Sequence, residues 1–516
     1  MKKILIVPLL FLASLAFADQ AEGRPNILFC ISDDQSFPHA SAYGTTWVKT
    51  PAFDRVAREG VLFTRAYTPN AKCAPSRSII ITGRNSWQLE AAANHVPNFP
   101  DKFKSFVEAL GEQGYTTGMT GKGWAPGNAN GRLLTGKQYA KQKARPPAKG
   151  MSNNDYAANF KDFMDAASAD APWCFWYGAT EPHRGYEFKS GEKYAGKKPS
   201  DIDAVPAFWP DNETVRHDML DYAFEIEHFD AHLGRIIQLL EERGQLENTL
   251  IMVTADNGMP FPRVKGQTYE LSHHLPLAIM WKKGIASPGR VVEDYVSFVD
   301  FAPTIIQAAG LDWAGVGMSP TPGKSLFDIF TSTQAGQVNP ARDHVLIGKE
   351  RHDLGRPHDG GYPVRGMVKN GMLYILNYEI DRWPAGNPET GYMNTDGSPT
   401  KTHILDHRTD PAEAKYWQWN FGKKVAEELY DLQKDSACIN NLALNPEKAP
   451  IRKAMQEQVL AELKAEGDPR ALGNGAIFDA YPYAQDSRGY YERFKAGGKV
   501  RAGWINPSDI APAPLD

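Results

Sequence analysis

Short apolar runs alternate with segments of helical spacing along the chain up to about residue 340. The apolar runs predict strands at residues 25–31, 61–63, 115–119, 173–178 and 249–254. The segments of helical spacing predict helices at residues 52–59, 104–111 and 218–243. Strands that alternate with helices favour an α/β fold with a doubly wound, mostly parallel sheet. Ligands of such sheets bind beyond the carboxyl ends of the strands.

The pattern changes beyond about residue 340. The predicted elements there are strands at residues 364–368, 372–376 and 428–432 and a helix at residues 450–463. We therefore expect a larger α/β domain at residues 19–340 and a smaller α+β domain at residues 341–516 that contributes to a substrate pocket. The tail beyond about residue 469 is rich in glycine, proline and tyrosine, and we expect it to be irregular.

The first residues have the pattern of an export signal. Met1 and two lysines precede an apolar stretch at residues 4–15, and Ala-Phe-Ala at 16–18 is typical of a cleavage site. We expect residues 1–18 to be a signal peptide and the mature protein to be periplasmic or secreted. No later segment is apolar enough to predict a membrane span.

The net charge and the cysteine content limit which partners and which disulfides are expected. The net charge of −4 gives no reason to expect a nucleic-acid partner, so local cations would have to hold any anionic substrate. Four cysteines in an oxidising compartment would suggest disulfides. However, Cys30 and Cys174 lie in apolar strand-like runs and Cys438 lies in a polar loop, so we expect no structural disulfide.

The most specific motif is C-A-P-S-R at residues 73–77, followed by Thr-Gly at 82–83. The turn at Pro75 is expected to place Cys73 at a helix N-terminus, where unpaired N–H groups favour anions. Arg77, one helical turn further on, can neutralise an oxyanion. The alternative interpretation is a buried structural cysteine before a helix.

This stretch resembles the signature of type I sulfatases, which have an alkaline phosphatase-like fold. The resemblance implies that Cys73 is oxidised to formylglycine by a formylglycine-generating maturation enzyme. A hydrated aldehyde carries two geminal hydroxyls, of which one can attack sulfur and the other can expel the sulfate by eliminating back to the aldehyde. A serine or an unmodified thiol has no such exit route.

Two polar pairs at predicted strand ends offer oxygen ligands. Asp33 and Asp34 directly follow the first strand, and Asp256 and Asn257 follow a later one. Together with the formylglycine hydroxyl at position 73 (Cys73), they suit a hard cation, Ca²⁺ or Mg²⁺, and no histidine and cysteine set suits zinc. The resemblance favours calcium. A helix cap or a turn is the alternative for an Asp-Asp pair.

The resemblance also assigns roles to three further residues. Lys122 falls where sulfatases hold the substrate sulfate, Lys265 falls near a second cationic contact, and His183 resembles the histidine that protonates the leaving group. The family pattern has a histidine two residues after Lys122, but this chain has Trp124, which leaves the base for sulfate elimination open. Trp124 could instead form an apolar wall against a sugar ring. Alternatives near Lys265 are Arg263, His273 and His274.

Residues 181–184 and 256–262 resemble the heparan N-sulfatase (sulfamidase) branch. This implies removal of sulfate from a terminal N-sulfated glucosamine, with O-sulfated sugars of other glycans as the open alternative. The residues expected to bind the sulfated glycan are Trp124, Arg184, Arg351, His352, Asp353, Arg356 and Trp383. A solvated charged loop is the alternative for the charged residues at 351–356.

Two other functions fit the same residues. One is phosphomonoester or phosphonate hydrolysis, since that superfamily shares the fold and the metal ligands; turnover of sulfate and phosphate esters by one preparation separates the two. The other is a non-catalytic sulfoglycan-binding protein in which Cys73 stays unconverted, which mass spectrometry of the Cys73 peptide would reveal.

Overall fold

The computed structural model describes residues 23–511, except 169, 170, 486, 499 and 501. The expected signal peptide at residues 1–18 lies outside this part of the chain. Among the helices of the described residues, none combines the length and the apolar character needed to cross a membrane.

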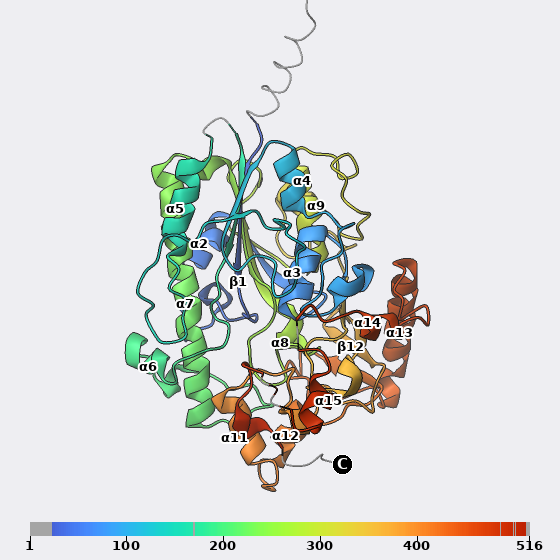
Figure 1. The fold of residues 1–516 in the computed structure, drawn as a ribbon. Coiled ribbons are helices and arrows are strands. Elements are labelled where there is room, and N and C mark those ends of the chain that lie inside the picture. The colour runs from blue at the N-terminus through green and yellow to red at the C-terminus, as the bar shows by residue number, and fades with distance from the viewer. Residues whose placement is uncertain (1–22, 169–170, 486, 499, 501, 512–516) are drawn as a thin grey trace, which may run out of the picture.

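A large sheet forms the centre of the molecule (Figure 1). Across the described residues it has nine strands in the order β4-β3-β5-β1-β6-β7-β2-β8, with β9 paired to β2. The strands are β1 (Asn26–Ser32), β2 (Val61–Tyr67), β3 (Thr116–Gly121), β4 (Lys137–Gln138), β5 (Trp173–Gly178), β6 (Thr249–Ala255), β7 (His274–Met280), β8 (Arg290–Val292) and β9 (Val296–Ser297). The neighbours β3, β5, β1 and β6 are parallel, whereas β7 is antiparallel to both β6 and β2. The predicted mostly parallel α/β sheet is confirmed.

Helices cover both faces of this sheet. They are α2 (Pro51–Glu59), α5 (Tyr156–Ala166) and α7 (Glu213–Glu242) on one face, and α3 (Cys73–Thr82), α4 (Phe106–Glu112) and α9 (Phe301–Ala308) on the other (Figure 1). Strand alternation explains the two cores, because Ile27, Phe29 and Ile31 of β1 pack toward α3, α4 and α9. Leu28 and Cys30 of the same strand pack toward α2, α5 and α7. Both faces of β1 are therefore buried, as its continuous apolar run predicts.

A second sheet follows in the C-terminal part of the chain. It is antiparallel and consists of β10 (His344–Lys349), β11 (Val364–Lys369), β12 (Met372–Asn377) and β13 (Glu427–Asp431). The remaining helices are α6 (Ser190–Ala195), α8 (Glu270–His273), α10 (Phe327–Phe330), α11 (Pro399–Asp406), α12 (Ala414–Asn420), α13 (Ala449–Ala465), α14 (Ile477–Ala480) and α15 (Tyr490–Lys495). This confirms a smaller α+β part, while the domain boundary near residue 340 stays a prediction.

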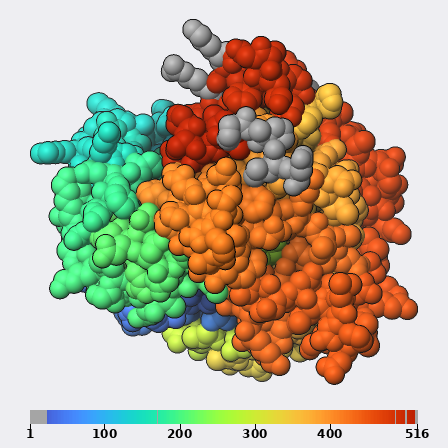
Figure 2. Space-filling model, turned by 90° about the horizontal axis from the view of Figure 1, so that it is seen from below, coloured from blue at the N-terminus to red at the C-terminus, as the bar shows by residue number. Residues whose placement is uncertain are grey.

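The C-terminal part is joined closely to the first. Seen from below, its orange and red residues lie directly beside the green residues of α7 (Figure 2), and α11 packs against α7. The tail is less irregular than expected, since it contains α14 and α15. All four cysteines are buried and free.

Candidate active site

Four parallel strands bring the predicted segments to one edge of the large sheet. Gly121 at the end of β3 pairs with Gly178 at the end of β5, and Gly178 pairs with Ile31 of β1. Ser32 of β1 pairs in turn with Ala255 of β6. The side chains that follow these strand ends are those of Lys122, His183, Asp33, Asp34, Asp256 and Asn257. They lie side by side because the strand ends do.

Cys73 is the first residue of α3, which begins after β2 at the same edge. Its buried Sγ lies 3.7 Å from Oδ1 of Asp33. Burial raises the pKa of this thiol to about 12, although Lys122 and Lys265 act in the opposite direction. An unmodified thiol in this place stays protonated at neutral pH and is a poor nucleophile.

The acidic residues beside Cys73 are paired with two lysines, of which Lys265 is buried and Lys122 is partly exposed. Nζ of Lys122 lies 2.8 and 2.6 Å from the carboxylate oxygens of Asp33. Nζ of Lys265 lies 2.7 Å from Oδ2 of Asp34 and 2.9 Å from Oδ2 of Asp396. Burial opposes the charge of both lysines, but Asp33 raises the pKa of Lys122, and Asp34 and Asp396 raise that of Lys265. Both ammonium groups therefore stay charged where an anion could enter.

Arg77 is fully buried behind the nucleophile position. Its Nε lies 2.8 Å from Oδ2 of Asp256, and its Nη1 donates to the main-chain carbonyls of Lys122 and Gly123 at 2.8 and 2.9 Å. These contacts tie α3 to the ends of β3 and β6. Burial opposes the charge of Arg77, but Asp256 and Asp33 raise its pKa overall.

The oxygen atoms at this edge fit a hard cation. One carboxylate oxygen each of Asp33 and Asp34 and Sγ of Cys73 lie within 4.8 Å of one another. Nδ2 of Asn257 donates to Oδ1 of Asp34 at 2.7 Å. Oδ1 of Asn257 is buried and has no hydrogen-bond partner within the described part of the chain. Buried carboxylates beside an unpaired amide oxygen suit Ca²⁺ or Mg²⁺.

A cavity of about 310 Å³ opens onto Cys73. It is lined by Lys72, Cys73, His95, Val96, Lys122, Ala125, Pro126, His183, Lys265, Asp353, Asp396, Tyr483, Gln485 and Trp504. His183 is partly exposed, its Nε2 lies 4.0 Å from Oδ2 of Asp34, and its Nδ1 donates to the carbonyl of Arg184 at 3.1 Å. Because Nδ1 donates to the main chain, Nε2 is the nitrogen that can exchange a proton with a ligand.

Trp124 does not form the apolar wall predicted for it. Its indole N–H donates to Oγ of Ser78 at 2.8 Å, and its ring lies edge-on to Phe99 at 5.1 Å. The side chain is buried in the core cluster that contains α3, α4 and α9. The cavity wall at this point is formed by Ala125 and Pro126 instead.

Other predicted sugar-binding residues also lie away from this cavity. Arg351, His352 and Arg356 are buried and contact main-chain carbonyls. Trp383 is half-buried and accepts the ammonium of a lysine over its ring. Asp353 is the residue of this group that lines the cavity, as far as the described residues show. Of the charged residues at 351–356, Arg351, His352 and Arg356 therefore stabilise the surrounding main chain, and Asp353 faces the cavity.

The sequence did not indicate three ionisable residues of the cavity, Lys72, His95 and Asp396. Nζ of Lys72 lies 2.7 Å from Oδ2 of Asp353, and Nδ1 of His95 lies 2.9 Å from Oδ1 of the same carboxylate. Lys72 directly precedes Cys73, and this adjacency was a usable signal. His95 and Asp396 lie in irregular segments and belong to no motif.

A second cavity, of about 720 Å³, adjoins the first and shares His183, Asp396 and Trp504 with it. Arg184 lines this second cavity. Its guanidinium binds the carboxylate of Asp218 and lies 4.2 Å from the ring centre of Phe261. The guanidinium of Arg184 is therefore held by Asp218 and Phe261, and it also lines the second cavity.

Comparisons with known proteins identify relatives over most of the chain. A family model described as Sulfatase matches residues 25–311. N-sulphoglucosamine sulphohydrolase of Homo sapiens is 26% identical over 476 residues, which cover 85% of this chain and 89% of that protein. An ulvan-active sulfatase of Formosa agariphila is 26% identical over 456 residues, which cover 86% and 81%. A solved structure in complex with its substrate, D-glucosamine-2-N,6-O-disulfate, has the same fold, with a TM-score of 0.61, 19% identity and coverage of 86% of this chain and 98% of that one.

Proposed function

Because the chain belongs to the sulfatase family, we propose that it hydrolyses sulfate groups from the ends of sulfated glycans. The observation that carries this proposal is the position of Cys73 at the start of α3, facing a cavity walled by Lys122, Lys265 and His183. An anionic group in this cavity meets the ammonium groups of Lys122 and Lys265 and the imidazole of His183. Such preorganised charges are what sulfate transfer requires.

Membership of the family implies a formylglycine at position 73 and a divalent metal ion. When present, the formylglycine supplies a hydrated aldehyde whose hydroxyls attack sulfur and later expel sulfate, and the ion supplies Lewis acidity toward a sulfate oxygen. We propose calcium, held by Asp33, Asp34, Asp256 and Asn257, because calcium tolerates an irregular set of oxygen ligands better than magnesium does. The maturation enzyme that would convert Cys73 is a proposed partner.

Lys122 and Lys265 are proposed to bind the sulfate group. Each ammonium is held in place by a buried carboxylate, that of Asp33 or Asp34, so it does not need to reorganise when the anion arrives. Arg77 supports this arrangement by fixing Asp256 and the start of the loop after β3.

His183 is proposed as the acid that protonates the leaving group. Its Nδ1 keeps its hydrogen bond to the carbonyl of Arg184, so Nε2 carries the proton that passes to the departing nitrogen or oxygen. In the imidazolium form both nitrogens donate, which this geometry permits.

His95 is proposed as the base that accepts the proton of the remaining formylglycine hydroxyl when sulfate leaves. The family pattern has a histidine at the position where this chain has Trp124, so another base is needed for this step. Asp353 accepts a hydrogen bond from Nδ1 of His95, which leaves the lone pair on Nε2. Within the described residues, Nε2 is buried without a hydrogen-bond partner. Burial lowers the pKa of His95, although Asp353 acts in the opposite direction, so the ring is neutral at neutral pH and can accept a proton.

The size of the first cavity and the two motif segments support a proposal for the preferred sugar. A space of about 310 Å³ suits a single terminal sugar, and the larger cavity beside it offers room for the next unit of a chain. The resemblance at residues 181–184 and 256–262 favours N-sulfated glucosamine. Relatives named for N-sulphoglucosamine and for ulvan are equally similar, so O-sulfated sugars are the second candidates.

The proposed site of action is the periplasm or the exterior, on the strength of the export signal at residues 1–18. Sulfated glycans of high mass would be met there. Fractionation of the host, followed by detection of the mature N-terminus, tests this location.

The deciding experiment is sulfate release by protein co-expressed with a formylglycine-generating enzyme, on N-sulfo- and O-sulfo-glucosamine side by side. We expect release from the N-sulfated sugar, and release from O-sulfated sugars alone would reject the sulfamidase assignment. Faster turnover of phosphate or phosphonate monoesters would favour the alternative hydrolase. A Cys73 peptide that keeps its thiol, together with tight binding and no turnover, would favour a binding protein.

A further inference from the structure

Trp504, in the C-terminal tail, lies where the two cavities of the active site meet. It lines both of them, together with His183 and Asp396. The residue is half-buried, and it packs against an apolar cluster that contains Val96 and Tyr483. Both of these residues also line the first cavity. Trp504 is therefore placed beside a sugar that occupies the first cavity and close to the bond that would join it to the next unit.

Two hydrogen bonds fix Trp504 against the segment that carries Asp396. Its indole N–H donates to the carbonyl of Met393 at 2.8 Å. Its own carbonyl accepts from the N–H of Gly397 at 2.7 Å. Because the N–H is the only polar group of this side chain, the part of the side chain that remains for a ligand is the apolar ring.

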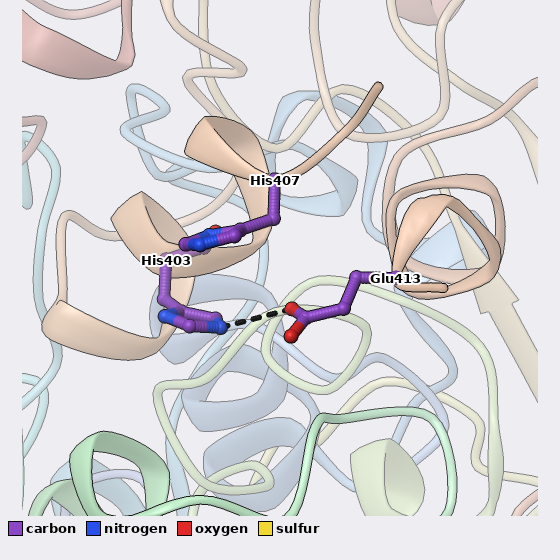
Figure 3. Close-up of side chains that lie close together, drawn as sticks. All are labelled: His403, His407 and Glu413. Atoms are coloured by element: carbon purple, nitrogen blue, oxygen red, sulfur yellow. Dashed lines mark hydrogen bonds and ion pairs between the residues drawn. The ribbon is translucent and has the colours of Figure 1, made fainter. Parts of the chain in front are cut away.

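The tail that carries Trp504 is docked on a helix that the protein holds from two sides. Oγ1 of Thr402, on α11, donates to Oδ1 of Asp509 in the tail at 2.7 Å. The next residue of the helix, His403, has its Nε2 2.9 Å from Oε2 of Glu413, which directly precedes α12 (Figure 3). The rings of His403 and His407 also stack, at a centre-to-centre distance of 4.1 Å (Figure 3). The ring of Trp504 is therefore presented to the cavities by a fixed support.

We propose that the sulfated sugar stacks on the ring of Trp504. Sugar rings present apolar C–H faces, and an indole offers a large and rigid apolar surface at a low cost in conformational entropy. Trp504 would thus have the role that the sequence suggested for Trp124 and Trp383, of which the first is buried in the core and neither lines the cavity. This inference rests on the proposed function, since it takes a sulfated sugar as the ligand.

The proposal separates the two parts of the ligand. The sulfate group is assigned to Lys122 and Lys265, and the sugar ring is assigned to Trp504. Inorganic sulfate contains only the first part, so its affinity should not depend on the indole. A change at Trp504 that displaced Asp396 would instead disturb Lys265, because the two side chains are paired at 2.9 Å, and would weaken the binding of both ligands.

Binding is measured by calorimetry on the full chain with Ca²⁺ and with Cys73→Ser, so that no turnover occurs. The ligands are N-sulfoglucosamine, 6-O-sulfoglucosamine and inorganic sulfate. Trp504→Ala removes the ring and its N–H, whereas Trp504→Phe keeps a ring and loses the N–H. The matched control is Trp313→Ala, because Trp313 is also half-buried, donates its indole N–H to the carbonyl of Ser319 at 2.9 Å and lines neither cavity. Circular dichroism verifies that each variant is folded.

Trp504→Ala should weaken the binding of the preferred sulfated sugar about tenfold, because an aromatic contact and the apolar area that it buries are lost. Inorganic sulfate should bind this variant with unchanged affinity. Trp504→Phe should keep most of the affinity for the sugar, and Trp313→Ala should keep all of it.

Unchanged affinity of Trp504→Ala for the sugar would overturn the proposal. An equal loss for inorganic sulfate would also overturn it, because Trp504 would then only support the segment that carries Asp396. An equal loss in Trp504→Phe would show that the N–H matters and the ring does not. If none of the three ligands binds before Trp504 is changed, the inference fails together with the proposed function. Sugar binding that depends on Trp504, without sulfate release by the matured protein, would reject the proposed function and leave this inference standing.

Discussion

Replacing His95 with glutamine is expected to slow the release of sulfate much more than the first release of desulfated sugar. In the structure, Nδ1 of His95 contacts Oδ1 of Asp353, and Nζ of Lys72 holds Oδ2 of the same carboxylate at 2.7 Å. Glutamine removes the imidazole but leaves Asp353 paired with Lys72. The cost to folding is therefore that of one altered hydrogen bond, about 1–3 kcal/mol.

The kinetic effect should be larger than the effect on stability. A positioned general base contributes about a hundredfold to ten-thousandfold to a rate. This corresponds to about 3–5 kcal/mol of activation free energy at 1.36 kcal/mol per tenfold. Because His183 is unchanged, protonation of the leaving group should proceed at the wild-type rate. Loss of His95 should affect the later step alone.

The assay is a rapid-quench time course in which desulfated sugar and free sulfate are both measured. In the His95→Gln variant we expect about one equivalent of sugar to appear quickly and sulfate to follow slowly, with KM for the sugar not increased. His358→Gln, an exposed histidine elsewhere, should behave as the wild type. If both products slow together and KM rises, His95 binds substrate and is not the base; if neither slows, it has no part in the reaction.

Three further predictions concern the nucleophile, the ion and the buried pair. The variant Cys73→Ser should lose turnover and still bind a sulfated sugar, as measured by calorimetry; full activity would refute the proposed chemistry. Removal of divalent ions by a chelator should lower both activity and melting temperature, because the buried oxygens of Asp33, Asp34 and Asn257 then lose the ion that we propose they share, and Ca²⁺ should restore both at lower concentration than Mg²⁺. The pKa of Asp353 is lowered overall, because the ammonium of Lys72 and the hydrogen bond from His95 outweigh its burial, so its contribution to stability is present above the ordinary carboxyl range and is lost as the pH falls below it. Asp353→Asn should therefore reduce the free energy of unfolding by about 3–5 kcal/mol at neutral pH, and the difference from the wild type should shrink toward about pH 3 in urea titrations.

The fold was largely predictable because its central strands have the simplest pattern. β1, β5 and β6 are buried on both faces, so each appears in the sequence as a continuous apolar run. The predicted ends of the helices and strands were less accurate than their positions. The long helix α7 begins at Glu213, five residues before the predicted start, because the side chain of Asn212 caps it by accepting from the N–H of Val215.

The site residues that the sequence indicated are those attached to strand ends or to the motif at 73–77. The residues at 351–353 show why the others could not be assigned individually. Arg351 turns to the carbonyl of Tyr481, His352 turns to Asn70, and Asp353 turns into the cavity. In an irregular segment no periodicity states which neighbour faces a ligand.

The two halves of the chain share the charges of one cavity, and this has a consequence for how specificity can change. Asp353 and Asp396 come from the C-terminal part, and they pair with Lys72, next to the nucleophile, and with Lys265. All four side chains are buried, and removal of one partner from a buried pair leaves an uncompensated charge that costs about 3–5 kcal/mol. A substitution that alters one of these carboxylates therefore also disturbs Lys72, next to the nucleophile, or Lys265, which we propose to hold sulfate. Specificity for the sugar and transfer of the sulfate are coupled through these pairs, so new substrates are more readily gained by changes at Tyr483 or Trp504, which line the cavity without such a pair within the described residues.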